Sequence, residues 1–152
     1  MQTVNLKQSL ASGVSMVLDN LSPKAISTLK QMKLVQNSAE KFAKASFVFF
    51  NAQHEINNKV KEMNVILKSK ATLEEKKTVE EEANKLVMPM IEERDRIGEE
   101  ICETELSNDE VEFLRVNFKS LISDNFKTIR HALEVAEALG VDFEAEEEEK
   151  KK

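Results

Sequence analysis

The second quarter of the chain carries a regular stripe of hydrophobic residues. It has ten positions at alternating spacings of four and three, and eight of them are apolar: Val35, Ala39, Phe42, Ser46, Phe49, Gln53, Ile56, Val60, Met63 and Leu67. Side chains at this spacing share one face of an α-helix. The pattern therefore predicts the seam of a long helix that packs against other helices.

The expected start of this helix is Ser22-Pro23, because serine caps a helix and proline suits its first turn. No proline or glycine follows until Pro89. The helix is therefore predicted to extend from Ser22 to about Lys70, roughly 70 Å at the α-helical rise. Before it, residues 1–21 have helical spacing interrupted by serines and a glycine. They predict a short helix near 10–20 with a loose or extended start.

A second helix is predicted to begin after Thr72, which forms a capping box with Glu75. Its apolar stripe continues past Pro89 as far as Ile101, so residues 97–105 are also predicted to be helical. Proline removes one helical hydrogen bond, which predicts a kink at Pro89. A complete break at this proline is the alternative.

A third helix is predicted from a second capping box, formed by Ser107 and Glu110. Its apolar positions continue to residue 139, and a bend is expected at residues 123–124. Gly140 suits the left-handed residue that ends a helix, and Val141 suits the hydrophobic contact that accompanies it.

These signals predict an all-α fold, an elongated antiparallel bundle of three main helices plus a short N-terminal helix. Residues 1–21 would form an N-terminal segment, residues 22–141 the bundle, and residues 142–152 a charged, disordered tail. From residue 144 the tail has no apolar side chain larger than alanine, so burial cannot offset the entropy of ordering it. The first helix is longer than its successors, so part of it would need a partner.

Composition supports a helical, non-secreted protein. The 152 residues include only three glycines and two prolines, and 33% of them are charged. Tyrosine and tryptophan are absent, which disfavours the aromatic stacking platforms of single-strand binders. The single cysteine excludes a disulfide within the chain and suits a reducing compartment. No secretory signal or membrane-spanning stretch is visible.

Charge is distributed unevenly along the chain. Residues 1–70 hold ten lysines against four acidic residues, whereas residues 71–152 hold twelve basic residues against 24 acidic ones. Packing of a basic helix on an acidic one explains this asymmetry, and an acidic face for a basic partner is the alternative. The lysines are scattered and the basic half has no arginine, which disfavours direct nucleic-acid binding.

No residue pattern predicts catalysis, a cofactor, a metal or a small-molecule substrate. The Glu-x-x-His pattern of carboxylate-bridged metal bundles fails for both histidines, because Asn51 precedes His54 and Thr128 precedes His131. Cys102 lies beside Glu99, Glu100 and Glu103, whose negative charge disfavours a reactive thiolate.

Two groups of residues are candidates for a protein interface. Phenylalanines at 47 and 50 point away from the stripe and make one helical turn apolar on most sides. Either the N-terminal segment covers them, or a partner does. An acidic run near the end of the second helix is the other group. The candidate interface residues are Phe47, Phe50, Glu92, Glu93, Glu99 and Glu100.

Two segments, Leu-Ser-Pro-Lys-Ala-Ile-Ser-Thr-Leu-Lys at 21–30 and Glu-Leu-Ser-Asn-Asp-Glu-Val-Glu-Phe-Leu at 105–114, open helices on either side of a charged turn. In this order of signals the chain resembles, over roughly residues 21–125, small helical proteins of unknown function from tailed bacteriophages. The resemblance implies a non-enzymatic role in a phage-infected bacterial cytoplasm or in the virion. It assigns no functional residues.

The expected function is therefore a helical protein–protein interaction scaffold, a phage structural or assembly component that self-associates or docks on a larger particle. The alternative is an acidic phage inhibitor of a host nucleic-acid-handling defence complex, in which the acidic run at 74–112 imitates phosphates.

Overall fold

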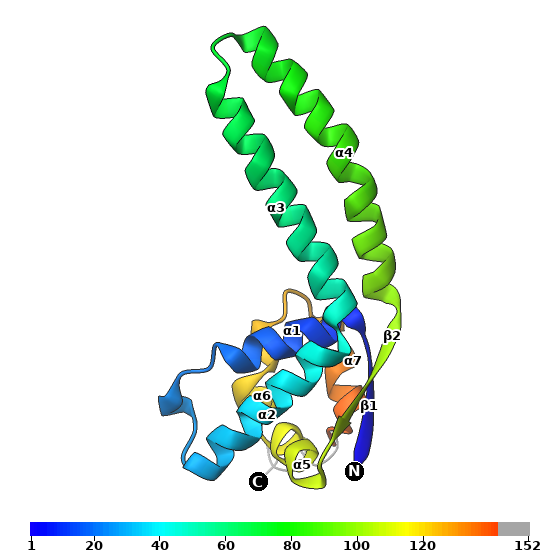
Figure 1. The fold of residues 1–152 in the computed structure, drawn as a ribbon. Helices are drawn as coiled ribbons and strands as arrows, with labels where there is room; N and C mark the ends of the chain where they lie inside the picture. The colour runs from blue at the N-terminus through cyan, green and yellow to red at the C-terminus, as the bar shows by residue number, and fades with distance from the viewer. Residues whose placement is uncertain (143–152) are drawn as a thin grey trace.

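The computed structural model describes residues 1–142 and shows a mostly helical protein with a two-stranded sheet (Figure 1). The expected disorder of the tail concerns residues that lie, apart from Asp142, outside this range. In chain order the elements are β1 (Gln2–Lys7), α1 (Gln8–Asp19), the 3-10 turn η1 (Pro23–Ala25), α2 (Leu29–Ala45), α3 (Phe47–Ser69), α4 (Leu73–Glu99), β2 (Ile101–Leu106), α5 (Asn108–Val116), α6 (Phe118–Leu121), η2 (Ser123–Asn125) and α7 (Ile129–Leu139).

The molecule has two parts. Helices α3 and α4 form an antiparallel hairpin, residues 47–99, that projects from the rest of the chain (Figure 1). We call this hairpin the arm and the other elements the head. The expected bundle of three long helices is therefore replaced by a helical head and one two-helix arm.

The head holds the hydrophobic core. Helix α1 packs along α2, both contact the sheet, and α2 also contacts α5, while α7 packs on β1 and α5 (Figure 1). The largest side chains with almost no exposed surface are Phe42, Leu106, Leu114, Ile122 and Leu139. They come from α2, β2, α5, α7 and the junction between α6 and η2, so the core joins segments from several parts of the chain.

The sheet corrects most of the prediction that residues 97–105 are helical, because α4 ends at Glu99 and Ile101–Leu106 form β2. Strand β2 pairs antiparallel with β1, and Leu6 lies opposite Cys102. Thr104 and Leu106 are buried while Glu103 and Glu105 are exposed, which is the period of two that a half-buried strand requires. Because α4 ends at Glu99, Ile101 lies in the strand and not on the helical stripe, and its side chain is 62% exposed.

The long first helix predicted over 22–70 is interrupted twice. Ser22 accepts a hydrogen bond from the Lys24 amide and caps only the short turn η1, and α2 begins six residues later, after Thr28. At Ser46 the chain changes direction between α2 and α3 (Figure 1). The buried Ser46 hydroxyl donates to the Phe42 carbonyl at 2.8 Å, a bond that bends helices at serine.

The second helix follows the prediction more closely. Thr72 accepts a hydrogen bond from the Glu75 amide at 3.2 Å, and the Glu75 carboxylate accepts one from the Ala71 amide. Helix α4 then continues from Leu73 to Glu99 without a break at Pro89. The alternative of a full break is therefore wrong.

The third helix is divided into α5, α6 and α7. Its predicted start is confirmed, because Ser107 and Glu110 form both hydrogen bonds of a capping box. Asn117 ends α5, and η2 occupies the bend expected at 123–124. The predicted end is also confirmed: Gly140 has a φ of 76°, and the Val141 amide donates to the Ala136 carbonyl at 3.0 Å.

The arm has much less core than the head. Between residues 47 and 99 the buried apolar side chains are those of Ile56, Val79 and Ile97. In the described part of the chain, no helix has the length and apolarity needed to cross a bilayer.

Candidate interaction surface

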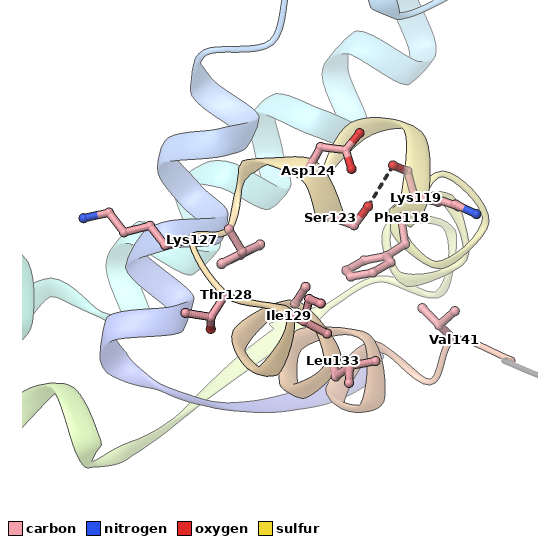
Figure 2. Close-up of a pocket in the computed structure, with 11 residues that line it drawn as sticks. Phe118, Lys119, Ser123, Asp124, Lys127, Thr128, Ile129, Leu133 and Val141 are labelled. Carbon is pink, nitrogen blue, oxygen red and sulfur yellow. Dashed lines mark hydrogen bonds between the residues drawn. The ribbon is translucent and has the colours of Figure 1, made fainter.

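The head contains an open cavity of about 500 Å³ between η2 and the first turns of α7 (Figure 2). Phe118, Leu133 and Val141 point toward it, and Ile129 is 80% exposed at its rim. Its polar side chains are those of Ser123, Asp124, Lys119, Lys127 and Thr128. These include no histidine to activate the serine, so the lining does not suggest nucleophilic catalysis.

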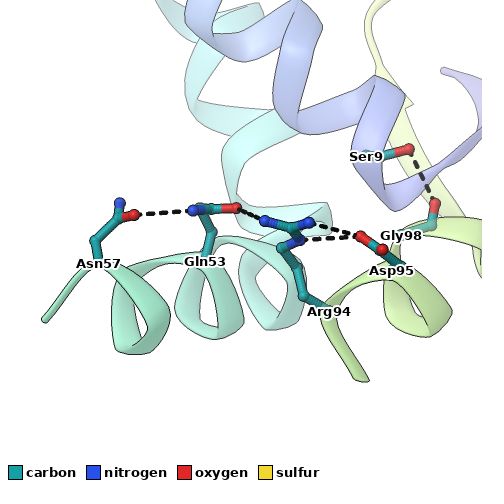
Figure 3. Close-up of polar contacts among 6 residues, drawn as sticks. All are labelled: Ser9, Gln53, Asn57, Arg94, Asp95 and Gly98. Carbon is teal, nitrogen blue, oxygen red and sulfur yellow. Dashed lines mark hydrogen bonds and ion pairs between the residues drawn. The ribbon is translucent and has the colours of Figure 1, made fainter. Parts of the chain in front are cut away.

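The base of the arm is fixed to helix α1. The Ser9 hydroxyl donates to the Gly98 carbonyl at 3.1 Å (Figure 3). The Phe49 amide donates to the Gln8 side chain at 3.2 Å. Phe49 also packs closely on Gly98, where an added Cβ would lie 3.0 Å from the Phe49 ring. Glycine is therefore needed at 98 for α4 to approach α3 and α1.

A polar chain crosses the apolar seam one turn further along the arm (Figure 3). Arg94 donates from one nitrogen to the Gln53 carbonyl oxygen at 2.8 Å, and Gln53 donates to Asn57 at 2.9 Å. Two other nitrogens of the guanidinium donate to Asp95. A half-buried arginine bonded across two helices favours one register of the hairpin over slipped ones.

The two candidate phenylalanines lie on the surface of the arm. Phe47 is 57% exposed and Phe50 is 54% exposed. The N-terminal segment therefore does not cover them, and that alternative is wrong. The Phe50 ring stacks on His54 with centroids 6.2 Å apart and an interplanar angle of 7°. This is an exposed aromatic turn near the head.

Three of the four candidate glutamates take part in surface ion pairs. Arg96 bonds both Glu93 and Glu100, and Glu99 pairs with Lys7 at 3.0 Å. The hydrogen bond from Arg96 lowers the pKa of Glu93, and the two carboxylates raise the pKa of Arg96. Exposed pairs of this kind contribute little to stability. Much of the acidic charge at this end of α4 is already balanced within the chain.

The aromatic and acidic candidates lie on opposite sides of the arm. Phe49 and Arg94 face the neighbouring helix, as their contacts show. Phe47 and Glu92 each precede these residues by two positions, which is about 200° around a helix. Phe47 therefore points away from α4, and Glu92 points away from α3. The aromatic and acidic candidates do not form one continuous patch.

The outer half of the arm carries exposed apolar residues that the apolar stripe did not predict. Six large side chains there are 40% or more exposed: Val60, Val65, Ile66, Leu73, Leu86 and Met88. An open cavity of about 400 Å³ lies between the two helices in the same region. The adjacent pair Val65-Ile66, next to the stripe position Leu67, was the available signal, since no single stripe can bury three consecutive residues.

The described residues hold no cluster of three or more histidine, cysteine, aspartate or glutamate side chains that could bind a metal. Cys102 is half-buried in β2, and burial raises the pKa of its thiol. This thiol is therefore protonated at neutral pH and a poor nucleophile.

In comparisons with known proteins, no family model, no curated protein and no solved structure matches this chain.

Proposed function

We propose that this protein is a non-enzymatic interaction scaffold that binds another protein chain through its arm. The observation that carries the proposal is the exposure of apolar side chains on a projecting element. Leu73 is 86% exposed, Val65 is 70% exposed and Met88 is 52% exposed. Monomeric soluble proteins rarely expose clustered apolar surface, and such surface marks binding sites.

The shape of the molecule supports this proposal. The arm projects from the head, and α3 ends and α4 begins at a tip far from the head (Figure 1). The head has its own core, which does not need the outer half of the arm. The outer half is thus available for a partner without loss of the head's packing. Within this proposal we assign the protein to phage structure or assembly, as the sequence resemblance implies.

The acidic side of α4 favours a second candidate function. Helix α4 has nine acidic residues against five basic ones. An acidic helix of this kind suits an inhibitor that occupies a basic nucleic-acid channel. Added polyphosphate or DNA would displace such an inhibitor from its target, whereas a partner held by apolar contacts would stay bound.

Binding through the arm is tested by affinity capture with three forms of the full chain: the native protein, a triple variant of the arm and a double variant of the head as control. Val60→Ser, Ile66→Ser and Met88→Ser together remove exposed apolar residues of the arm, and Val60 also lines the cavity between its two helices. The control, Leu29→Ser with Val116→Ser, changes head residues that are 83% and 70% exposed. We expect a partner chain, either foreign or a tagged second copy, to be recovered with the native and control proteins and lost with the arm variant. Equal recovery with all three proteins would place the binding surface elsewhere.

A further inference from the structure

The groove in the outer half of the arm lies on one face of the hairpin. Its volume is about 400 Å³, and its lining residues are Val60, Met63, Asn64, Leu67, Glu80, Ala83, Asn84 and Val87. The lining positions recur at spacings of three and four on both helices, so they share one face. The two helices alone leave this seam unfilled.

Charges on the two sides of the groove are opposite in sign. Residues 57–70 hold four lysines and one glutamate, a net charge of +3. Residues 73–90 hold five glutamates and three lysines, a net charge of −2. Within the described residues, no ion pair joins α3 to α4. The basic side and the acidic side of the groove are therefore not paired with each other within one molecule.

A second copy of the arm offers both the missing apolar side chains and the complementary charges. Two hairpins that pack face to face form a four-helix bundle, a common arrangement for antiparallel helices. Closed two-fold symmetry is the commonest form of self-association.

Two symmetric arrangements are possible, and charge distinguishes them. If the tips point in opposite directions, α4 lies on α4 and α3 on α3, so like charges face each other. If the tips lie at the same end, α3 of each copy lies on α4 of the other, and the basic and acidic segments meet. Like charges in contact across an interface oppose binding, so the second arrangement is favoured.

The size of the face is sufficient for a stable dimer. Helix α3 has 23 residues. The groove forms part of a two-helix face that continues along the whole of α3, and at the α-helical rise and diameter contact along that whole face covers about 35 Å by 20 Å, or roughly 700 Å² on each copy. The total of about 1,400 Å² lies within the range of specific interfaces.

We propose that the arm binds a second copy of this chain, groove to groove, with both tips at the same end and α3 of each copy on α4 of the other. This proposal rests on the proposed role of the arm as a binding element. It adds the identity of the partner and the direction of the assembly.

The first test is sedimentation equilibrium of the full chain at concentrations up to about 100 μM, together with a matched pair of charge variants. Glu80→Lys reverses a charge that lines the groove, whereas Glu82→Lys makes the same change on α4 outside the groove lining. Both side chains are exposed, so circular dichroism should show unchanged folding in both variants. We expect a dimer for the native protein, about tenfold weaker dimerisation for Glu80→Lys, and a much smaller effect for Glu82→Lys.

The second test determines direction by disulfide trapping in a Cys102→Ser background. With the tips together, Val60 lies near the symmetry axis and close to Val60 of the other copy. Val60→Cys should therefore form a covalent dimer under mild oxidation. Val65→Cys, on the same helix but outside the groove lining, should not. Equal trapping of both variants, or none, contradicts the arrangement.

The outcomes separate this proposal from the more general one. A monomer at all concentrations in low salt overturns self-association. If affinity capture then recovers a different protein through the arm, the arm is still a binding element and only the second copy is wrong. If the arm variant also captures as well as the native protein does, both proposals fail.

Discussion

Arg94 and Gln53 are hydrogen-bonded across the two helices of the arm, with 2.8 Å between the guanidinium nitrogen and the amide oxygen. The arginine occupies a position that the apolar stripe of α4 would otherwise give to a hydrophobic residue. We therefore expect Gln53→Ala to lower the free energy of unfolding by about 1–2 kcal/mol, because the half-buried guanidinium keeps Asp95 but loses its hydrogen bond to the opposite helix.

The matched control for this change is Asn57→Ala. Asn57 accepts the exposed bond from Gln53, and its loss should change the free energy of unfolding by no more than about 0.5 kcal/mol. Thermal unfolding followed by circular dichroism measures both variants. Equal effects would show that the bond from Arg94 has no special role in the seam.

Two phenylalanines two positions apart should differ in their importance for folding. Phe49 packs between Gly98 and the head, while Phe47 is 57% exposed. We expect Phe49→Ala to cost roughly 3 kcal/mol of stability and Phe47→Ala to cost less than about 1 kcal/mol. Urea unfolding of the two variants compares these costs. A larger loss at Phe47 would contradict the orientation of α3.

Stability should fall in acid because of a buried carboxylate. Glu110 is 2% exposed, and burial alone would raise its pKa. Hydrogen bonds from Lys41, at 2.5 Å, and from Ser107 outweigh burial and lower this pKa below its ordinary value of 4.5. The carboxylate therefore stabilises the fold above the ordinary pKa, and this contribution is lost as the pH falls through the lowered value.

The prediction for Glu110 is tested by urea unfolding from neutral pH to about pH 3. Glu110→Gln should be less stable than the native protein at neutral pH, and the difference should shrink as the pH falls. Glu112→Gln changes an exposed neighbour on α5 and serves as the control. If the Glu110→Gln and Glu112→Gln profiles coincide, the buried pair with Lys41 does not determine the acid response.

The thiol of Cys102 should be slow to react in the folded protein. It is half-buried in β2, and burial raises its pKa. We expect alkylation by iodoacetamide at about pH 8 to be at least roughly tenfold slower than in urea-unfolded protein. Mass spectrometry over time follows the reaction. Equal rates would indicate that β2 separates readily from β1.

Local signals in the sequence predicted the helix boundaries that depend on neighbouring residues. The caps at Thr72 and Ser107 and the left-handed Gly140 each involve hydrogen bonds within a few residues. The true start of α2 has the same kind of signal, Thr28 followed three residues later by Gln31, and the structure shows the Thr28 cap. The earlier Ser22-Pro23 pair gave an equally strong local signal but begins only a short turn.

The sheet could not be predicted in the same way. Strands β1 and β2 are separated in the chain by α1, α2 and the whole arm, so their pairing depends on contacts between distant segments. Each strand has a short period-two pattern, Val4 and Leu6 in one and Thr104 and Leu106 in the other. Such short patterns are ambiguous until the partner strand is known.

The candidate interface could be predicted only in part from the sequence, because it also depends on contacts between distant segments. Apolar spacing shows that α3 has a packed face, but it does not show which helix covers that face. Only the change of direction at Ser46 separates α3 from the head and leaves its outer half with α4 alone. The exposure of Phe47 was anticipated as one alternative, whereas the exposed residues near the tip were not.

The arm is an insertion in the head, and its two ends lie next to each other. It leaves at Ser46 and returns at Glu100, and the close approach of Phe49 to Gly98 holds the two crossing points together. Its length is therefore independent of the head's packing. Removing seven residues from each helix, at matched heights near the tip, would keep the apolar phase of both helices and leave the crossing points unchanged. The length of the arm can therefore differ by whole heptads between natural variants that retain the same head.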